Sequence, residues 1–340
     1  MARAIKDIFC RYQTLKGKQV HRKGGWDTHG LPVELQVEKE LGITKEDIGK
    51  KITVEEYNQK CRETVMRFTD QWQEMTDKMG YWVDMEKPYV TYENNYIESV
   101  WHLLKVLYDK DLLYKGYTIQ PYSPAAGTGL SSHELNMPGT YQDVKDTSIT
   151  AQFKVNSIFD LHRPFVDEIY LVSASGKLMT RETDLIDVWF DSGAMPYAQW
   201  HYPFEAPPGG LGAVYPADFI SEGVDQTRGW FFTLHSISAM VSDSVAFKNV
   251  VSTGLVLDKN GNKMSKRLGN AVDPFETLKK YGADPTRWYM ITNSQPWDNL
   301  KFDLDGITEV RNKFFGTLTN TYNFFALYAN LDNYSIEEFA

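Results

Sequence analysis

Two lysines, Lys263 and Lys266, lie three residues apart in the stretch DKNGNKMSKRLGN. Gly261 and Gly269 flank them, and the apolar run 255–257 precedes the loop. Ammonium groups on long side chains suit phosphate oxygens that move during a reaction. By itself such a stretch is most often a solvated basic loop, so a phosphate site needs support from a second segment.

That second segment is SEGVDQTRGW, residues 221–230. Glu222, Asp225 and Gln226 bring polar side chains to the start of a predicted helix, and Gly223 allows a ligand to approach the backbone closely. The Asp225 carboxylate suits ribose hydroxyls. Alone, the segment also fits a plain helix cap. Neither a Walker A nor a GxGxxG pattern is present, so the two common phosphate cradles do not apply.

The two segments stand one strand apart in a predicted parallel sheet. The pattern predicts a strand at 217–221, a helix at 225–240 and strand material at 247–257. Such a strand–helix–strand unit makes a right-handed parallel crossover. Because parallel sheets bind ligands outside the carboxyl ends of their strands, both segments are expected at one ligand site of an α/β fold.

The remaining pattern predicts helices around this unit. Apolar residues recur at helical spacing over 3–16, and Gly17 suits a helix end. A short strand is expected at 18–22, and helices are expected at 44–80 and 93–112. A β-rich insertion is expected over 117–180, and an aromatic helix over 310–331.

Two further helices are expected to begin at DP pairs. Asp273 and Asp284 would cap them, with Pro274 and Pro285 in the first turn.

Composition limits the function classes. The chain has 340 residues, of which 42% are hydrophobic and 24% charged, and its net charge is −9. No apolar run is long enough for a membrane helix, so no membrane partner is expected. Cys10 and Cys61 are the only cysteines, which excludes a disulfide framework and favours a reducing, cytoplasmic location. A nucleic-acid partner would have to meet local basic patches.

Several motifs together resemble a known family. KMSKR after GLVLD, GWDTHGLPVE (25–34) and EGVDQTRGWFF (222–232) resemble the isoleucine members of the class I aminoacyl-tRNA synthetases. DVWFDSGAMP (187–196) and HRPFVDEI (162–169) also match, and the resemblance runs from residue 2 to about 330. Valine enzymes usually have a GTDHAG-like segment in place of GWDTHG, and leucine enzymes lack the DQTRGWF run.

The resemblance implies a domain organisation. A Rossmann-like catalytic domain would be formed by 1–33, with an incomplete N-terminus, and by 185–305. A helical and β-rich connective insertion would occupy 34–184, and 306–340 would begin a helical anticodon-binding domain. The family's HIGH tetrapeptide lies just before the helix with which this chain begins, so it is missing here, and the large hydrolytic editing domain of the family is replaced near 155–160 by a short connection. YSPAAGT (122–128) and SASGK (173–177) stand where relatives often have zinc-binding cysteines, so no zinc is expected.

The resemblance also implies a reaction. The family joins isoleucine to ATP, with Mg²⁺, as an adenylate and then passes the acyl group to tRNA(Ile). Lys263 and Lys266 would close over the leaving pyrophosphate as the catalytic pair, with Met264 and Ser265 beside the ATP.

The other ATP contacts would come from the sheet edge. Gly223 and Asp225 would hold the ribose, Glu222 and Gln226 the adenylate, and the backbone near Val256 the adenine.

The amino acid would be bound by three residues. Asp27 would pair with its ammonium group, and Trp189 and Trp230 would wall its side chain. His29 is expected only to fix a turn, and Asp191 and Arg228 to act structurally.

Two other functions remain open at this point. One is a non-catalytic remnant that keeps a nucleotide- or tRNA-binding surface, which the missing HIGH segment favours. The other is a valine–tRNA ligase. The intact KMSKR loop and Asp225 favour the enzyme, although activity of this shortened chain is doubtful. The complete protein is expected to be a monomer, whereas the uncovered aromatic tail of this chain is expected to self-associate.

Overall fold

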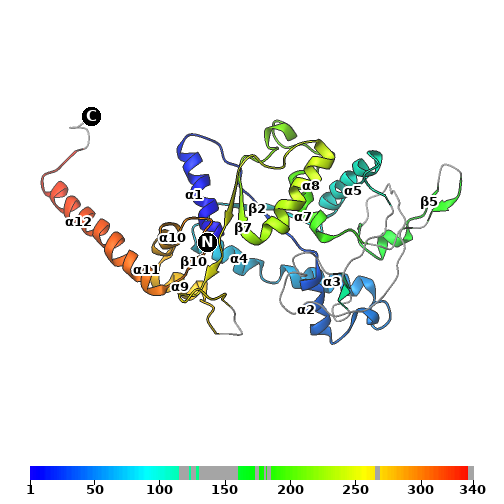
Figure 1. Ribbon diagram of the computed structural model, residues 1–340, viewed down its shortest axis with the longest axis horizontal. Coiled ribbons are helices and arrows are strands. Elements are labelled where there is room, and N and C mark those ends of the chain that lie inside the picture. Colours follow the sequence, from blue (N-terminus) through cyan, green and yellow to red (C-terminus); the bar gives the residue numbers. More distant parts are fainter. Residues whose placement is uncertain are drawn as a thin grey trace.

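The computed structural model describes residues 1–114, 122–123, 128–129, 160–172, 176–179, 181, 185–264 and 269–335. Three pairs of parallel strands lie at its centre (Figure 1). They are β1 (Lys23–Trp26) with β2 (Asp84–Val90), β7 (Ile220–Gly223) with β8 (Val250–Thr253), and β9 (Val256–Leu257) with β10 (Leu300–Lys301). Parallel strands with helices around them confirm the α/β fold class.

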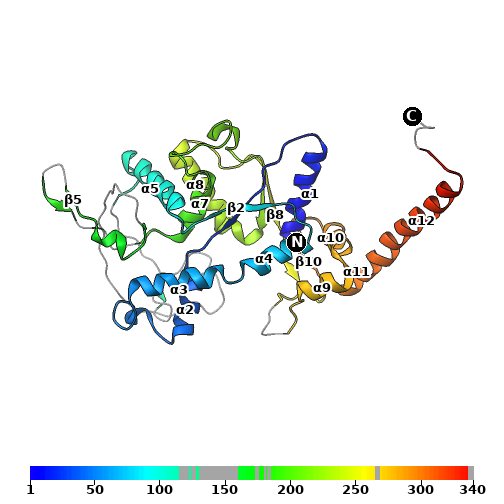
Figure 2. The same cartoon turned by 180° about the vertical axis from the view of Figure 1, so that it is seen from behind.

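Two groups of helices cover these strands. On one side α5 (Asn94–Asp109), α7 (Val188–Ala198) and α8 (Trp230–Ser242) pack together around a core that contains Tyr96, Leu103, Tyr197 and Ile237. On the other side α9 (Pro274–Tyr281), α10 (Ala283–Thr292) and α11 (Leu304–Val310) enclose a second core. α1 (Ala2–Leu15) lies between them and contacts β7 and α10 (Figure 2).

The chain between β1 and β2 forms a run of short helices. α2 (Leu31–Leu41), the 3₁₀ turn Lys45–Asp47, α3 (Val54–Met66) and α4 (Thr69–Lys78) follow β1, so the helix predicted over 44–80 is interrupted. The described part of the predicted β-rich insertion contains the antiparallel pairs β3–β4 (Tyr122–Ser123, Thr128–Gly129) and β5–β6 (Leu171–Val172, Leu178–Met179) and a 3₁₀ turn (Phe165–Glu168). Most of 117–180 lies outside the described residues.

The strand predicted at 18–22 is wrong in position, because β1 begins at Lys23 and includes two glycines. A Cβ on Gly25 would lie 2.0 Å from the Tyr89 ring, and one on Gly24 would lie 2.2 Å from the Met85 sulfur. Local preference disfavours glycine in a strand. The close approach of β2 therefore decides the position of β1. The sequence analysis also missed β2 and α2.

Helix starts are partly as predicted. Asp273 caps α9, since its carboxylate accepts from the Glu276 N–H at 3.0 Å, and Pro274 takes the first position. Asp284 does not cap α10, which begins one residue earlier at Ala283, although Pro285 still lies in its first turn. The helix predicted over 225–240 is divided at Gly229 into a 3₁₀ turn (Val224–Arg228) and α8.

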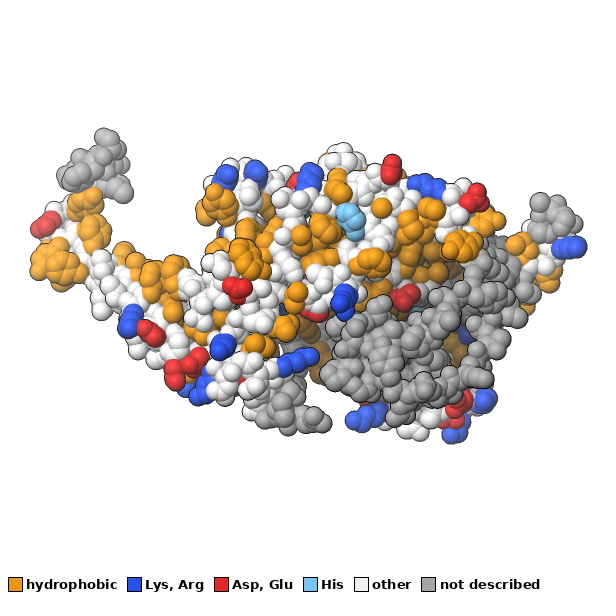
Figure 3. Space-filling model, viewed as in Figure 1, with side chains coloured by type: hydrophobic (Ala, Val, Ile, Leu, Met, Phe, Trp, Pro, Cys, Tyr) orange, Lys and Arg blue, Asp and Glu red, His pale blue; other side chains and the backbone are white. Residues whose placement is uncertain are grey.

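The last helix, α12 (Gly316–Leu331), follows a π turn (Arg311–Phe315) and extends away from the body (Figure 1). Phe314 stacks on Trp288 of α10 with ring centroids 4.1 Å apart, and Phe315 meets the same ring edge-on at 6.2 Å. These two aromatic residues of the tail therefore have a partner. The apolar side chains farther along α12 are exposed, as Figure 3 shows. Among the described residues, no helix is long and apolar enough to cross a membrane.

Candidate active site

The loop after β1 is held by hydrogen bonds to α7 and to Thr91, which follows β2. The Ser192 hydroxyl in α7 donates to the Asp27 carboxylate. Thr28 is buried, and its N–H and hydroxyl bond the Thr91 hydroxyl at 3.0 and 2.8 Å. These bonds hold Asp27 at the carboxyl end of β1, where a parallel sheet presents ligand-binding groups.

His29 joins the same loop to α7. Its Nδ1 lies 3.0 Å from the Asp191 carboxylate, and the Tyr96 hydroxyl donates to the Asp191 carbonyl at 2.6 Å. Asp191 therefore joins α7 to the loop after β1 through its side chain and to α5 through its carbonyl. His29 does more than fix its own turn, because it ties that turn to a helix more than 150 residues away in the chain.

The surroundings of Asp27 favour a cationic ligand. Removal of solvent by neighbouring protein atoms raises the pKa of Asp27; the Ser192 hydrogen bond opposes this effect, nearby Asp191 adds to it, and His29 opposes it. The residue itself remains accessible to solvent. A carboxylate that has lost part of its hydration gains more than an exposed one from pairing with an ammonium group.

The two tryptophans predicted to wall a side-chain slot lie close to each other. The Trp230 indole N–H donates to the Ser192 carbonyl at 3.0 Å. The Trp189 ring lies over Gly229, where a Cβ would be only 2.8 Å from it. Both rings are partly buried, at the junction between α7 and α8.

The predicted ribose and adenylate residues continue from this junction. The Gln226 side chain accepts from the Trp230 backbone N–H at 3.1 Å and donates to the Asp225 carboxylate at 3.0 Å. A Cβ on Gly223 would lie 2.4 Å from the Asp225 carboxylate, so only glycine lets that carboxylate lie so close to the backbone. A continuous line of contacts thus runs from Asp27 through α7 and α8 to the end of β7.

Glu222 has a partner that the sequence analysis did not foresee. Its carboxylate forms an ion pair with Lys6 of α1, and its backbone carbonyl accepts from the Thr253 hydroxyl at 3.2 Å. Both side chains of the ion pair remain partly accessible. This ion pair places the Lys6 ammonium group of α1 beside the predicted adenylate residues.

The predicted phosphate loop is organised by Asp258. Its carboxylate accepts from the N–H groups of Asn260 and Asn262 at 2.9 and 2.8 Å and from the Asn270 amide at 2.9 Å. These hydrogen bonds, that from Asn270 first, lower the pKa of Asp258 to about 2. These hydrogen bonds therefore join the two sides of the loop at its base.

Of the predicted loop residues, two are described. Lys263 is exposed, and its backbone forms an isolated antiparallel β-bridge with Leu257. Met264 packs against the core that includes residues of α10. Ser265 and Lys266 lie outside the described residues.

Val256, predicted to bind adenine through its backbone, lies in β9. The carbonyls of its neighbours Leu255 and Leu257 accept from the β10 segment at 2.9 Å each. Backbone groups of successive strand residues alternate in direction, so those of Val256 face away from β10.

Four residues that shape this site were not predicted from the sequence, namely Lys6, Ser192, Asp258 and Asn270. Ser192 carried one available signal, because a proline stands four residues after it within a helical stretch. Asp258 carried another, since the run Asp-Lys-Asn-Gly-Asn (258–262) is typical of a turn closed by a side chain.

Among the described residues, no group of three His, Cys, Asp or Glu side chains could hold a metal ion. Mg²⁺ commonly arrives with ATP and keeps most of its ligands from phosphates and water.

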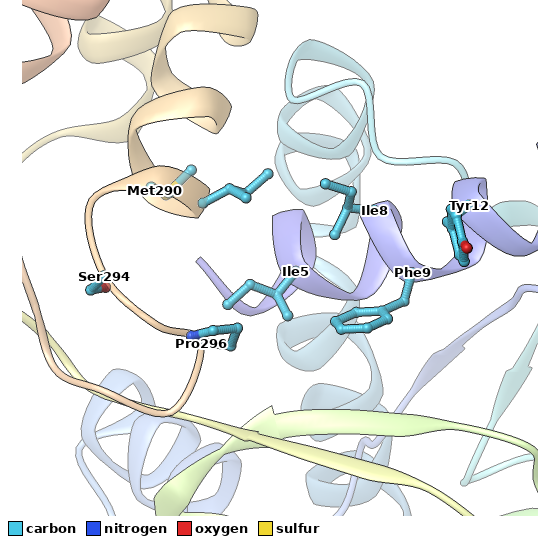
Figure 4. Close-up of a pocket in the computed structure, with 8 residues that line it drawn as sticks. Ile5, Ile8, Phe9, Tyr12, Met290, Ser294 and Pro296 are labelled. Carbon is cyan, nitrogen blue, oxygen red and sulfur yellow. The ribbon is translucent and has the colours of Figure 1, made fainter.

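A separate hollow lies between α1 and α10 (Figure 4). It has a volume of about 350 Å³ and is lined mainly by apolar side chains, among them Ile5, Phe9 and Met290. None of its lining residues is charged. It therefore lacks the groups that a phosphate or an ammonium ligand requires.

Comparisons with known proteins identify relatives of this chain. The family model described as tRNA synthetases class I (I, L, M and V) matches residues 1–158 and 141–303. Isoleucine–tRNA ligases of Cytophaga hutchinsonii and Bacteroides fragilis are 38% and 36% identical to this chain over 99% of its length. The chain spans 61% and 62% of those relatives. The first alignment runs over 676 residues, so about half of the matched part of that relative has no counterpart here.

Solved structures show the same fold. A leucyl-tRNA synthetase of Agrobacterium radiobacter, in a ternary complex with tRNA and LeuAMS, superposes with a TM-score of 0.64 at 12% identity, covering 92% of this chain and 68% of that one. A Mycobacterium tuberculosis methionyl-tRNA synthetase in complex with methionyl-adenylate gives 0.58 at 16% identity, covering 94% and 66%. The parallel strands and the family match over most of the chain lead to one conclusion: the chain belongs to the class I tRNA synthetases of the isoleucine, leucine, methionine and valine group.

Proposed function

We propose that this chain is the catalytic core of an isoleucine–tRNA ligase, which activates isoleucine with ATP and passes it to tRNA(Ile). The observation that carries the proposal is the continuous line of contacts from Asp27 through Ser192, Trp230 and Gln226 to Asp225. It spans the distance from a carboxylate suited to an ammonium group to one suited to a ribose. The likeness to isoleucine–tRNA ligases adds the choice of amino acid.

In this proposal Asp27 binds the ammonium group of isoleucine, and Trp189 and Trp230 bound the space for its side chain. Gln226 and Glu222 face the adenylate, and Lys6 holds Glu222 in position. The amino acid carboxylate is then presented toward the α-phosphate. Catalysis of this step rests on positioning and on stabilisation of charge, since the protein forms no covalent bond itself.

The ATP lies along the strand ends in the same proposal. Asp225 accepts from the ribose hydroxyls, and Gly223 gives the nucleotide room to approach. The adenine meets the outward-facing backbone of Val256. Lys263 and Lys266, with Met264 and Ser265 between them, contact the phosphates, and Mg²⁺ bound to the phosphates shares their charge. We expect no zinc in this chain, because YSPAAGT (122–128) and SASGK (173–177) contain no cysteine.

We also propose that the enzyme charges tRNA(Ile), that the complete protein is a monomer and that it is located in the cytoplasm. The choice of tRNA(Ile) follows from the choice of isoleucine.

The relatives carry a long stretch without counterpart here. The two segments matched by the family model overlap at residues 141–158, which include part of the short connection predicted near 155–160. We infer that this is where the relatives place their editing domain.

Binding and exchange measurements test the proposal. Calorimetry should detect isoleucine and ATP binding to the chain, and isoleucine-dependent exchange between ATP and pyrophosphate should follow. Failure to bind either ligand would contradict the proposal. Binding of ATP without exchange would favour the non-catalytic remnant. Preference for valine over isoleucine would assign the chain to valine and overturn the reading of Asp27, Trp189, Trp230 and Gln226.

A further inference from the structure

Helix α7 contains a proline, Pro196, four residues after Ser192. In an α-helix the carbonyl of each residue accepts from the N–H of the fourth residue after it. Proline has no N–H, so the Ser192 carbonyl has no donor within its own helix. A buried carbonyl without a partner is costly, and Ser192 is only 9% exposed.

The missing donor comes from another helix. The Trp230 indole N–H at the start of α8 donates to the Ser192 carbonyl at 3.0 Å. The two helices approach closely enough because the next residue is Gly193. A Cβ there would lie 2.8 Å from the Ile237 side chain and 3.0 Å from the Thr233 backbone.

Ser192 makes a second bond with its side chain. Its hydroxyl donates to the Asp27 carboxylate, and the alternative acceptor within the helix, the Val188 carbonyl, is farther away at 3.4 Å. A single residue therefore holds the carboxylate through its hydroxyl and the indole through its carbonyl. These are the two groups that the proposed function assigns to the ammonium group and to the side chain of the amino acid.

We propose that Ser192 is a positioning residue that couples the two halves of the amino-acid site, and that Pro196 keeps its carbonyl available for Trp230. The inference rests on the proposed function, because it concerns how the same site recognises an α-amino acid with an apolar side chain. The hydroxyl acts on recognition of the ammonium group, and the carbonyl acts on recognition of the side chain. The two effects are separable because they use different atoms of one residue.

The test compares two variants against ligands that lack one half of isoleucine. The ligands are L-isoleucine, L-valine and the 2-hydroxy acid with the isoleucine side chain, which has no ammonium group. Affinities are measured by calorimetry, with ATP as a separate readout of folding. Ser99→Ala is the matched control, because Ser99 is a buried helical serine of α5 that bonds only within its own helix.

Ser192→Ala should weaken isoleucine binding about tenfold and weaken binding of the 2-hydroxy acid clearly less, since an oriented Asp27 carboxylate forms a charge-assisted hydrogen bond with an ammonium group and only a weaker one with a hydroxyl. Pro196→Ala supplies a backbone N–H that competes for the Ser192 carbonyl. It should reduce the preference for isoleucine over valine severalfold and leave the preference for isoleucine over the 2-hydroxy acid intact. Ser99→Ala should change neither preference.

Equal losses for isoleucine and the 2-hydroxy acid in Ser192→Ala, with ATP binding retained, would overturn the coupling and leave the proposed function standing. Unchanged binding of both ligands would do the same. If Ser192→Ala loses ATP binding as well, Pro196→Ala decides the question, because it leaves every side chain of the site in place. A wild-type chain that binds neither isoleucine nor ATP would overturn the proposed function and this inference with it.

Discussion

The two ends of the candidate site are built in different ways. At the amino-acid end, Asp27, Ser192 and Trp230 come from a strand end and two helices, and each hydrogen bond joins different elements. At the phosphate end, the bonds that Asp258 makes reach no farther than Asn270, twelve residues on. Lys263 points out from this loop into solvent.

This difference matches the tasks proposed for the two ends. Discrimination between similar apolar side chains requires a wall fixed by tight packing, because a misplaced atom costs contacts on every side. Recognition of phosphate relies on charge, which acts over a longer range and tolerates movement of a long side chain. Changes of packing at the amino-acid end should therefore disturb stability and selectivity together, whereas removal of a lysine at the phosphate end should alter the rate alone.

Lys266→Ala is expected to show the largest difference between its effects on the two ends of the site. Contacts that a lysine makes mainly in the transition state contribute a few kcal/mol, so exchange between ATP and pyrophosphate should fall about a hundredfold. Isoleucine affinity should stay the same, because the amino-acid end does not depend on the loop. Lys259→Ala, in the same loop, is the control and should retain exchange. An unchanged exchange rate in Lys266→Ala would remove this residue from the site.

Gly193→Ala should have the opposite profile. A methyl group there meets Ile237 and the Thr233 backbone at or below 3.0 Å, so the free energy of unfolding should fall by about 2 kcal/mol in urea titrations. Isoleucine affinity should fall as well, because α7 and α8 move apart at Trp230. The control is Gly212→Ala, where a Cβ meets no atom within 4 Å. Equal stability of the two variants would show that the helices adapt to the methyl group.

A smaller and local effect is expected from the Asp258 carboxylate. The pKa of Asp258 is lowered to about 2 in the folded chain, below its ordinary value near 4. Hydrogen bonds to the ionised form are therefore fully present above about pH 4 and are lost as the pH falls through 2. The Asn262 amide signal in NMR spectra should titrate with a midpoint near pH 2.

In Asp258→Ala that titration should be absent, and amide exchange across 258–262 should be faster at pH 7. The melting temperature should barely change. A large loss of melting temperature would show that the loop supports the core and does not depend on its own bonds alone.

Deletion of residues 316–340 is expected to have the smallest effect on the stability of the rest of the molecule. The apolar side chains of α12 are exposed, so the melting temperature should stay within about 2 °C. Self-association should decrease, because the aromatic arm is removed while Phe314 and Phe315 stay on Trp288. Light scattering at high concentration measures this change. A clean monomer before the deletion would contradict the self-association predicted for the intact chain.

The sequence by itself determined the features that depend on neighbouring residues. Gly261 and Gly269 both have positive φ angles, of 90° and 68°, as loop glycines should. Asp273 and Pro274 begin α9 as predicted, and the helices over 3–16 and 93–112 are confirmed because apolar spacing fixes a helix locally. The parallel strand–helix–strand unit followed from the same kind of pattern.

The tertiary structure alone decided which distant residues meet. Asp27 and Ser192 are 165 positions apart, and Trp230 lies 38 positions after Ser192, so no periodic pattern links them. The position of β1 was likewise set by Tyr89, whose ring takes the space that a side chain at Gly25 would need. A sequence pattern records which face of an element is apolar. It does not record which atom of another element fills the remaining space, because that depends on how close two backbones can come.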